Sequence, residues 1–108
     1  MTKEEVFQRI KSDVESHKIL IYIKGTPQAP QCGFSDATVR LLNSLKVPYE
    51  SRDVIAHPDF RQYVPQYSNW PTFPQVFVSG KLLGGCDLIY EMHERGELEP
   101  LLKGAAHN

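Results

Sequence analysis

The chain has 108 residues, of which 41% are hydrophobic and 23% charged, an ordinary balance for a single globular domain over residues 1–108. Its formal net charge is −1 with acids and bases mixed, so nothing attracts a polyanion and nucleic acid is not an expected partner. The aliphatic run at 19–23 is too short to cross a bilayer and no basic-then-apolar leader opens the chain, so we expect no membrane segment. The expected location is the cytosol, or the mitochondrial matrix for a processed chain.

The first half of the chain predicts alternating helices and strands. Thr2 and Glu5 form a capping box ahead of apolar residues at helical spacing, and Pro48 ends a second helical pattern. The predicted elements are a helix at 3–16, a buried strand at 18–24, a loop at 25–31, a helix of about three turns from near Cys32, and a strand at 49–54.

The second half adds one helix, a hairpin and a final helical segment. Pro58 suits a first helical position, whereas Pro65 should kink or divide that helix. Ser79 and Gly80 separate two apolar stretches, which indicates a hairpin. The predicted elements are a helix at 57–70, a hairpin at 74–85, and a helix at 86–102 that breaks at Gly96 before a last short turn. This order predicts a mixed sheet with helices on both faces.

The segment PQCGFSD holds one cysteine where a Cys-x-x-Cys redox motif has two. Ser35 occupies the position of the resolving cysteine and cannot close a disulfide. The predicted helix begins at Cys32, and its positive end, together with Lys24, favours the thiolate. The alternative interpretation of Cys32 is a small buried apolar residue. Lys24 and Arg61 become candidate site residues if the fold brings them to one groove beside Cys32.

A second candidate feature is the segment WPTFPQ, in which Pro74 stands directly before an apolar strand. A proline there would waste a backbone donor position. A cis peptide bond between Phe73 and Pro74 would turn the preceding backbone outward. A plain extended loop is the alternative, and composition alone favours it because few X–Pro bonds are cis.

A third candidate feature is the segment GGCD, between the hairpin and the next helix. Gly84 and Gly85 let a ligand or another backbone segment approach closely. Asp87 is a candidate N-cap of the helix. The N–H groups of Cys86 and Asp87 are also a candidate site for a carboxylate at the helix start. The two roles are compatible with each other.

Together, KGTPQAPQCGFS (24–35), WPTFPQVFVSG (70–80) and GGCD (84–87) resemble a monothiol glutaredoxin of the CGFS class, and the resemblance extends over residues 3–103. It implies a thioredoxin-like α/β fold, with a four-stranded mixed sheet and helices on both faces. It also implies that glutathione binds beside the active cysteine and that a [2Fe–2S] cluster is held between two subunits, as a homodimer.

The resemblance also implies roles for individual residues, since each matches a position of the family motif. The implied roles are contact with the glycine carboxylate of glutathione for Lys24 and Arg61, backbone pairing with its cysteine for Phe73, the cis-proline for Pro74, contact with its γ-glutamyl end for Cys86 and Asp87, and cluster ligation for Cys32. Whether Cys86 pairs with Cys32 in an oxidised form depends on a distance that the sequence leaves open.

Three functions follow from the resemblance. The first is a carrier that assembles and transfers [2Fe–2S] clusters to apo iron–sulfur client proteins. The second is a glutathione-dependent oxidoreductase that removes glutathione from protein thiols with Cys32 alone, which is chemically feasible because a second glutathione can resolve the intermediate. The third is a regulatory adaptor that shares its cluster with BolA-like proteins. The CGFS class favours the carrier, with weak oxidoreductase activity at most.

Overall fold

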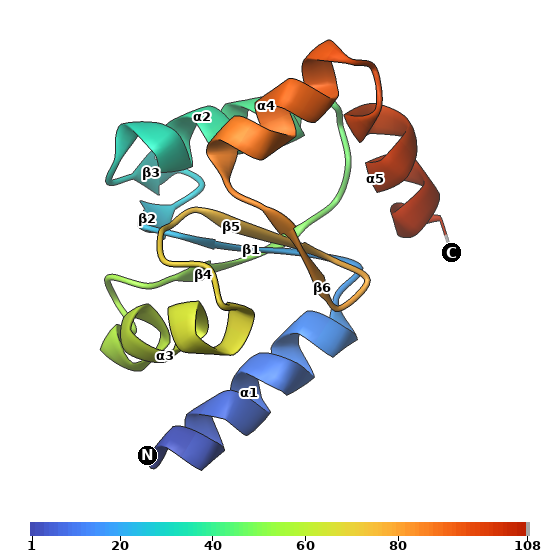
Figure 1. Cartoon of the computed structure of the whole chain (residues 1–108). Coiled ribbons are helices and arrows are strands. Elements are labelled where there is room, and N and C mark those ends of the chain that lie inside the picture. The colour runs from blue at the N-terminus through green and yellow to red at the C-terminus, as the bar shows by residue number, and fades with distance from the viewer. Residues whose placement is uncertain (108) are drawn as a thin grey trace.

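A four-stranded sheet forms the middle layer of the protein, which is described by a computed structural model over residues 1–107 (Figure 1). The elements are, in chain order, α1 (Lys3–Ser16), β1 (Ile19–Ile23), β2 (Gly25–Thr26), β3 (Ala29–Pro30), α2 (Gly33–Ser44), β4 (Glu50–Asp53), α3 (Pro58–Ser68), β5 (Gln75–Val78), β6 (Lys81–Gly84), α4 (Cys86–Glu94) and α5 (Leu98–Ala106). Within residues 1–107, no helix has both the length and the apolar character that crossing a membrane requires.

The sheet is mixed, as the element order predicts. Its strand order is β4-β1-β5-β6, with β1 parallel to β4 and antiparallel to β5. The pair β5 and β6 forms the predicted hairpin, whose two turn residues, Ser79 and Gly80, both have positive φ as a tight hairpin turn requires. Helices α1 and α3 cover one face of the sheet, and α2, α4 and α5 lie over the other (Figure 1).

Strand β1 is buried on both faces, and this arrangement divides the core in two. Ile19, Ile21 and Ile23 join the apolar cluster that includes residues of α2, α4 and α5. Leu20 and Tyr22 join the second cluster, which includes residues of α1 and α3. Successive side chains of a strand point to opposite faces, so the unbroken apolar run ILIYI supplies both clusters at once.

Three local expectations differ from the structure. The predicted loop at 25–31 contains the short antiparallel pair β2 and β3. Pro65 does not divide α3, because a proline removes only one helical hydrogen bond and the buried Phe60 and Val64 anchor the helix before it. The break at Gly96 is confirmed, but α5 is a nine-residue helix rather than a short turn, with three buried residues along one face.

Asp53, the last residue of β4, ties the sheet to two loops. Its Oδ1 accepts the backbone N–H groups of Gly25 at 2.9 Å, Ile55 at 2.9 Å and Ala56 at 3.3 Å. Burial raises the pKa of Asp53, but these three N–H groups and the nearby His57 outweigh it, so the pKa lies below the ordinary value. One carboxylate therefore fixes both the segment that leads to Cys32 and the segment that leads to α3.

We expect Asp53→Asn to destabilise the fold by about 1 kcal/mol at pH 7, since the N–H groups lose a charged acceptor at a partly exposed site. The folded-state pKa lies below the unfolded value of about 3.9, so the carboxylate stabilises the fold above that pH. This stabilisation is lost as the pH falls through the folded-state pKa. Urea unfolding should therefore show a difference in the free energy of unfolding between wild type and variant. This difference should be largest at pH 7 and should decrease below about pH 4.

The control is Asp59→Asn, which removes an exposed carboxylate in the first turn of α3. It should leave the free energy of unfolding nearly unchanged. A gap between wild type and Asp53→Asn that stays constant from pH 7 to about pH 3.5 would contradict the role assigned to the carboxylate charge.

Candidate functional site

A cleft of about 720 Å³ lies beside the start of α2. Its walls come from the end of β1, the first turn of α2, α3, the loop before β5, and the start of α4. Six of the seven residues singled out from the sequence line it, namely Lys24, Arg61, Phe73, Pro74, Cys86 and Asp87. They come from distant parts of the chain, so the fold assembles them into one site.

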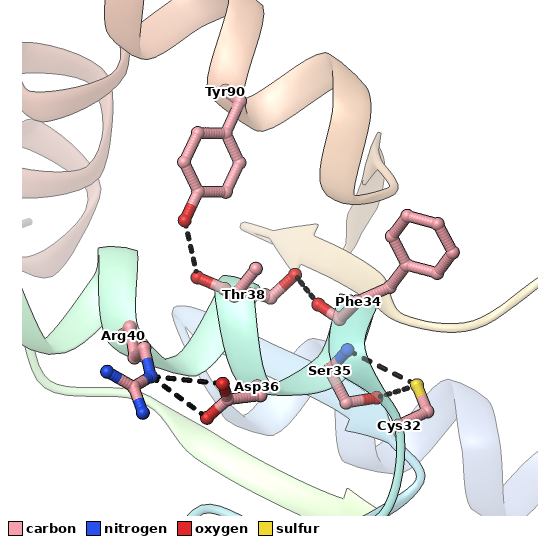
Figure 2. A network of polar contacts seen from close by, with 8 residues as sticks. Cys32, Phe34, Ser35, Asp36, Thr38, Arg40 and Tyr90 are labelled. Carbon is pink, nitrogen blue, oxygen red and sulfur yellow. Dashed lines mark hydrogen bonds and ion pairs between the residues drawn. The ribbon is translucent and has the colours of Figure 1, made fainter.

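Cys32, the seventh residue, is the N-cap of α2 and lies next to the cleft lining. Its neighbour Phe34, with 62% of its surface exposed, lines the cleft from the first turn of the same helix. The Sγ atom accepts the backbone N–H of Ser35 at 3.3 Å and lies 3.2 Å from the Ser35 hydroxyl (Figure 2). The sulfur therefore occupies the place that a serine or aspartate oxygen usually takes at a helix start.

Ser35 is fully buried, and its hydroxyl is oriented by a second contact. Its Oγ accepts the backbone N–H of Lys24 at 3.1 Å. In the thiol form, Cys32 donates its hydrogen to this oxygen. When Cys32 ionises, the hydroxyl hydrogen can turn to the thiolate, because the Lys24 N–H occupies the other side of the oxygen.

The surroundings of Cys32 favour its ionised form. Burial raises the pKa of the thiol, but the Ser35 hydroxyl, the N–H groups of Ser35 and Phe34, and the positive charge of Lys24 together bring it below the ordinary value. A lowered pKa at a helix start was expected from the sequence. The hydroxyl contribution was not, because the motif reveals only that Ser35 cannot form a disulfide.

Two cations face the cleft without a local partner. Lys24 follows β1 and is half-buried, whereas Arg61 lies on α3 and is exposed. Neither side chain forms an ion pair within residues 1–107, although several other arginines and lysines do. Their role as candidate site residues depended on their lying in one groove, and both line this cleft.

The start of α4 forms another part of the cleft, and the prediction that Asp87 caps this helix is wrong. Helix α4 begins at Cys86, its N-cap is Gly85, and no side chain in the described part of the chain caps it. Asp87 is the second residue of the helix and lies in its first turn. The helix start falls earlier because the extended Gly85 backbone already has the N-cap conformation. The first N–H groups of α4 thus receive no side-chain cap, as the candidate carboxylate site requires.

The two glycines before α4 accommodate the protein's own groups. A Cβ atom on Gly85 would lie 3.3 Å from both the Pro74 carbonyl oxygen and Trp70 Nε1. A Cβ atom on Gly84, which has φ near +151°, would collide with the side chain of Leu88. The close approach predicted from the sequence is therefore made by the loop before β5 and by α4 itself.

The loop before β5 contains the cis bond that was one of two alternatives, and the cleft has two further lining residues that the sequence did not point out. The Phe73–Pro74 peptide bond is cis, so the alternative of a plain extended loop is wrong. The two further lining residues are Trp70, in this loop, and Glu91, in α4. Glu91 lies four residues after Asp87, and helical spacing could have indicated that the two share a face.

Neither cysteine is engaged in a disulfide, and both are half-buried. Within residues 1–107, no three side chains of the histidine, cysteine, aspartate or glutamate type come together in a group able to hold a metal ion.

The glutaredoxin family model matches residues 19–83 of the chain. The chain is 49% identical over 102 residues to "Glutaredoxin 4" of Pasteurella multocida, covering 94% of each protein. It is 51% identical over 86 residues to "Probable monothiol glutaredoxin GrlA" of Legionella pneumophila, covering 80% of this chain and 97% of that one. Its structure is similar to that of a buckwheat glutaredoxin–glutathione complex, with a TM-score of 0.84, 25% identity, and coverage of 95% and 92%.

We expect Ser35→Ala to raise the pKa of Cys32, since the thiolate loses a hydroxyl donor while the backbone donors remain. The rate of alkylation by iodoacetamide against pH reports this pKa, and the wild-type midpoint should lie below the value of about 8.5 for a free cysteine. The matched control is Ser44→Ala, which removes a hydroxyl at the other end of α2. Equal midpoints for Ser35→Ala and wild type would contradict the role of the hydroxyl.

Proposed function

The chain belongs to the glutaredoxin family, as a monothiol member with the thioredoxin-like fold, and we propose that it binds glutathione beside Cys32 and carries a [2Fe–2S] cluster in iron–sulfur cluster assembly and transfer. One observation carries this proposal. A single cleft beside a thiolate-favouring cysteine combines two unpaired cations with an uncapped helix start. Its volume falls within the range that small-molecule sites occupy in proteins.

The charges of glutathione match the cleft. Glutathione has two carboxylates, one ammonium group and one thiol. Lys24 and Arg61 would bind the glycine carboxylate through charge-assisted hydrogen bonds. The first N–H groups of α4 would bind the γ-glutamyl carboxylate, and Asp87 would face the ammonium group. The glutathione complex of the buckwheat protein supports this ligand.

The middle of the tripeptide would meet the loop before β5. The backbone of Phe73 would pair with the cysteine residue of glutathione, next to the cis peptide bond to Pro74. Cys86 would contribute its backbone N–H at the γ-glutamyl end. Held at both ends and in the middle, the ligand would present its thiol beside Cys32.

The donor set fits a cluster that is shared between subunits. A [2Fe–2S] cluster requires four thiolates, and residues 1–107 contain no group of three or more histidine, cysteine, aspartate or glutamate side chains able to hold a metal ion. Cys32 and the bound glutathione would each supply one thiolate, and a second subunit with its glutathione would supply the other two. Half of these ligands are exchangeable small molecules, so the cluster would be transferred readily to apo client proteins.

A second candidate function is removal of glutathione from protein thiols. The thiolate of Cys32 would attack the glutathione sulfur of a mixed disulfide, forming a Cys32–glutathione disulfide and releasing the protein thiolate. A second glutathione thiolate would then attack the bound glutathione sulfur, releasing oxidised glutathione and regenerating Cys32. The lowered pKa of Cys32 favours this route. Ser35 cannot take the resolving role, so in this route free glutathione resolves the intermediate.

The cluster would also be the route to other partners. A BolA-like protein that replaces one subunit would change the ligand set of the shared cluster, which would make this chain a regulatory adaptor. The compartment, cytosol or mitochondrial matrix, remains a prediction from the sequence.

We expect Arg61→Ala to weaken glutathione binding by roughly tenfold to a hundredfold, because one charge-assisted hydrogen bond at a partly exposed site contributes about 1–3 kcal/mol. Isothermal titration calorimetry with reduced glutathione measures this loss. The matched control is Arg40→Ala, which removes an exposed arginine paired with Asp36 outside the cleft lining. Unchanged affinity in Arg61→Ala would remove Arg61 from the site.

A second prediction separates the two cysteines. Cys32→Ser should abolish the cluster, because a serine hydroxyl is a hard and poorly ionised substitute for a thiolate. Cys86→Ser should still assemble a coloured dimer, since serine keeps the backbone N–H assigned to glutathione. Anaerobic reconstitution with iron, sulfide and glutathione, followed by absorption and mass measurements, compares the two variants.

Three outcomes would count against the cluster assignment. A colourless Cys86→Ser beside a coloured Cys32→Ser would reverse the ligand assignment. Equal cluster content in both variants would mean that neither thiol is an essential ligand. A colourless wild type that turns over a glutathione mixed disulfide would favour the oxidoreductase instead.

A further inference from the structure

A buried amide lies directly behind the loop that lines the cleft. Gln75, the first residue of β5, has no exposed surface. Its Nε2 donates to the carbonyl oxygen of Trp70 at 2.8 Å and to that of Thr72 at 3.2 Å. Its Oε1 has no hydrogen-bond partner within residues 1–107. Both donors of this side chain thus serve a single loop, which contributes consecutive residues to the cleft wall.

These hydrogen bonds determine the orientation of one peptide unit. The Thr72 carbonyl points to a fully buried amide, so it points into the protein. The Thr72–Phe73 peptide is trans, which places the N–H of Phe73 opposite that carbonyl. The ladder between β1 and β5 begins at Gln75, so the Phe73 N–H lies outside the paired register. This N–H is therefore turned from the interior, on a residue that lines the cleft.

We propose that Gln75 is a positioning residue for ligand binding: by holding two loop carbonyls inward, it presents the Phe73 N–H to the ligand as a ready-made donor. The inference rests on the proposed binding of glutathione, whose cysteine carbonyl would accept this hydrogen bond. Gln75 touches no ligand itself. It acts through the loop, which Gly85 supports at the Pro74 carbonyl and the Trp70 indole.

The choice of an amide at this position supports the proposal. The next two residues of β5, Val76 and Phe77, are buried apolar side chains, as a strand in this core requires. Burying an amide costs free energy unless its polar atoms are bonded, and Oε1 has no partner. Two donors directed to one loop give a reason for a buried amide at this position.

The experiment compares Gln75→Met, which keeps the volume of the side chain but removes both donors, with Val14→Ala. Val14 is fully buried in α1, and α1 contributes no residue to the cleft, so this variant lowers the melting temperature while every side chain that lines the cleft, and both Gln75 donors, stay in place. Titration calorimetry with reduced glutathione, well below both melting temperatures, should show a loss of about tenfold in affinity for Gln75→Met. Val14→Ala should bind within about twofold of wild type, because lost stability alone does not weaken binding by the folded protein.

A second test uses the wild-type protein alone, so its result does not depend on how well a variant folds. Amide hydrogen exchange, followed by NMR, should show a Phe73 N–H that exchanges readily alone and is protected by glutathione. A Phe73 amide that is protected without ligand, or unprotected with it, would overturn the inference. Equal affinities of wild type and Gln75→Met would overturn it as well. A wild type that gives no binding heat would instead remove the proposed function.

Discussion

Burial of β1 on both faces is the constraint on which the site depends. Every residue from Ile19 to Ile23 is buried, including Tyr22 with its hydroxyl, so no side chain of this strand presents a polar group to solvent. From Ile19 onward, the first polar side chain that is not fully buried is that of Lys24, directly after the strand. Lys24 accordingly serves twice, because its backbone N–H orients the Ser35 hydroxyl while its side chain lines the cleft. The hydrophobic core thus determines where a charged ligand can bind.

Residues that do not line the cleft restrain its walls through hydrogen bonds. Asp53 fixes the segments leading to Cys32 and to α3, and Gln75 fixes the loop before β5. Ser35 joins the end of β1 to the start of α2. None of these three residues is among those that line the cleft. Ser35 and Gln75 bond directly to residues that do, and Asp53 bonds to Gly25, the neighbour of Lys24 in the chain. Restraint of this kind reduces the entropy that a flexible ligand and its site lose on binding.

The predictable parts of this protein are those encoded by neighbours in the sequence. The capping box at Thr2, the buried strand ILIYI and the hairpin turn at Ser79 depend on adjacent residues, and the structure has each of them. The cap assigned to Asp87 failed because the backbone of Gly85, rather than a side chain, sets the start of α4. The bonds from Asp53 to Gly25 and from Ser35 to Lys24 could not be foreseen, since the fold brings together partners that lie 28 and 11 residues apart. The bonds from Gln75 to Trp70 and Thr72 are local, but they depend on the path of an irregular loop. The family motifs supplied the candidate residues, six of which line one cleft, but only packing reveals what holds them there.

The sulfur of Cys32 has two duties, since it is both the reactive atom and the cap of α2. The two equilibria are therefore linked: an environment that favours the charged sulfur also favours the first turn of the helix, and fraying of that turn raises the pKa of Cys32 and so lowers the fraction of the sulfur that is ionised. A bond formed at this sulfur competes for the electron pair that accepts the Ser35 N–H. Chemistry at one atom is thereby transmitted to the conformation of the helix start, where Phe34 is exposed toward whatever approaches the cleft.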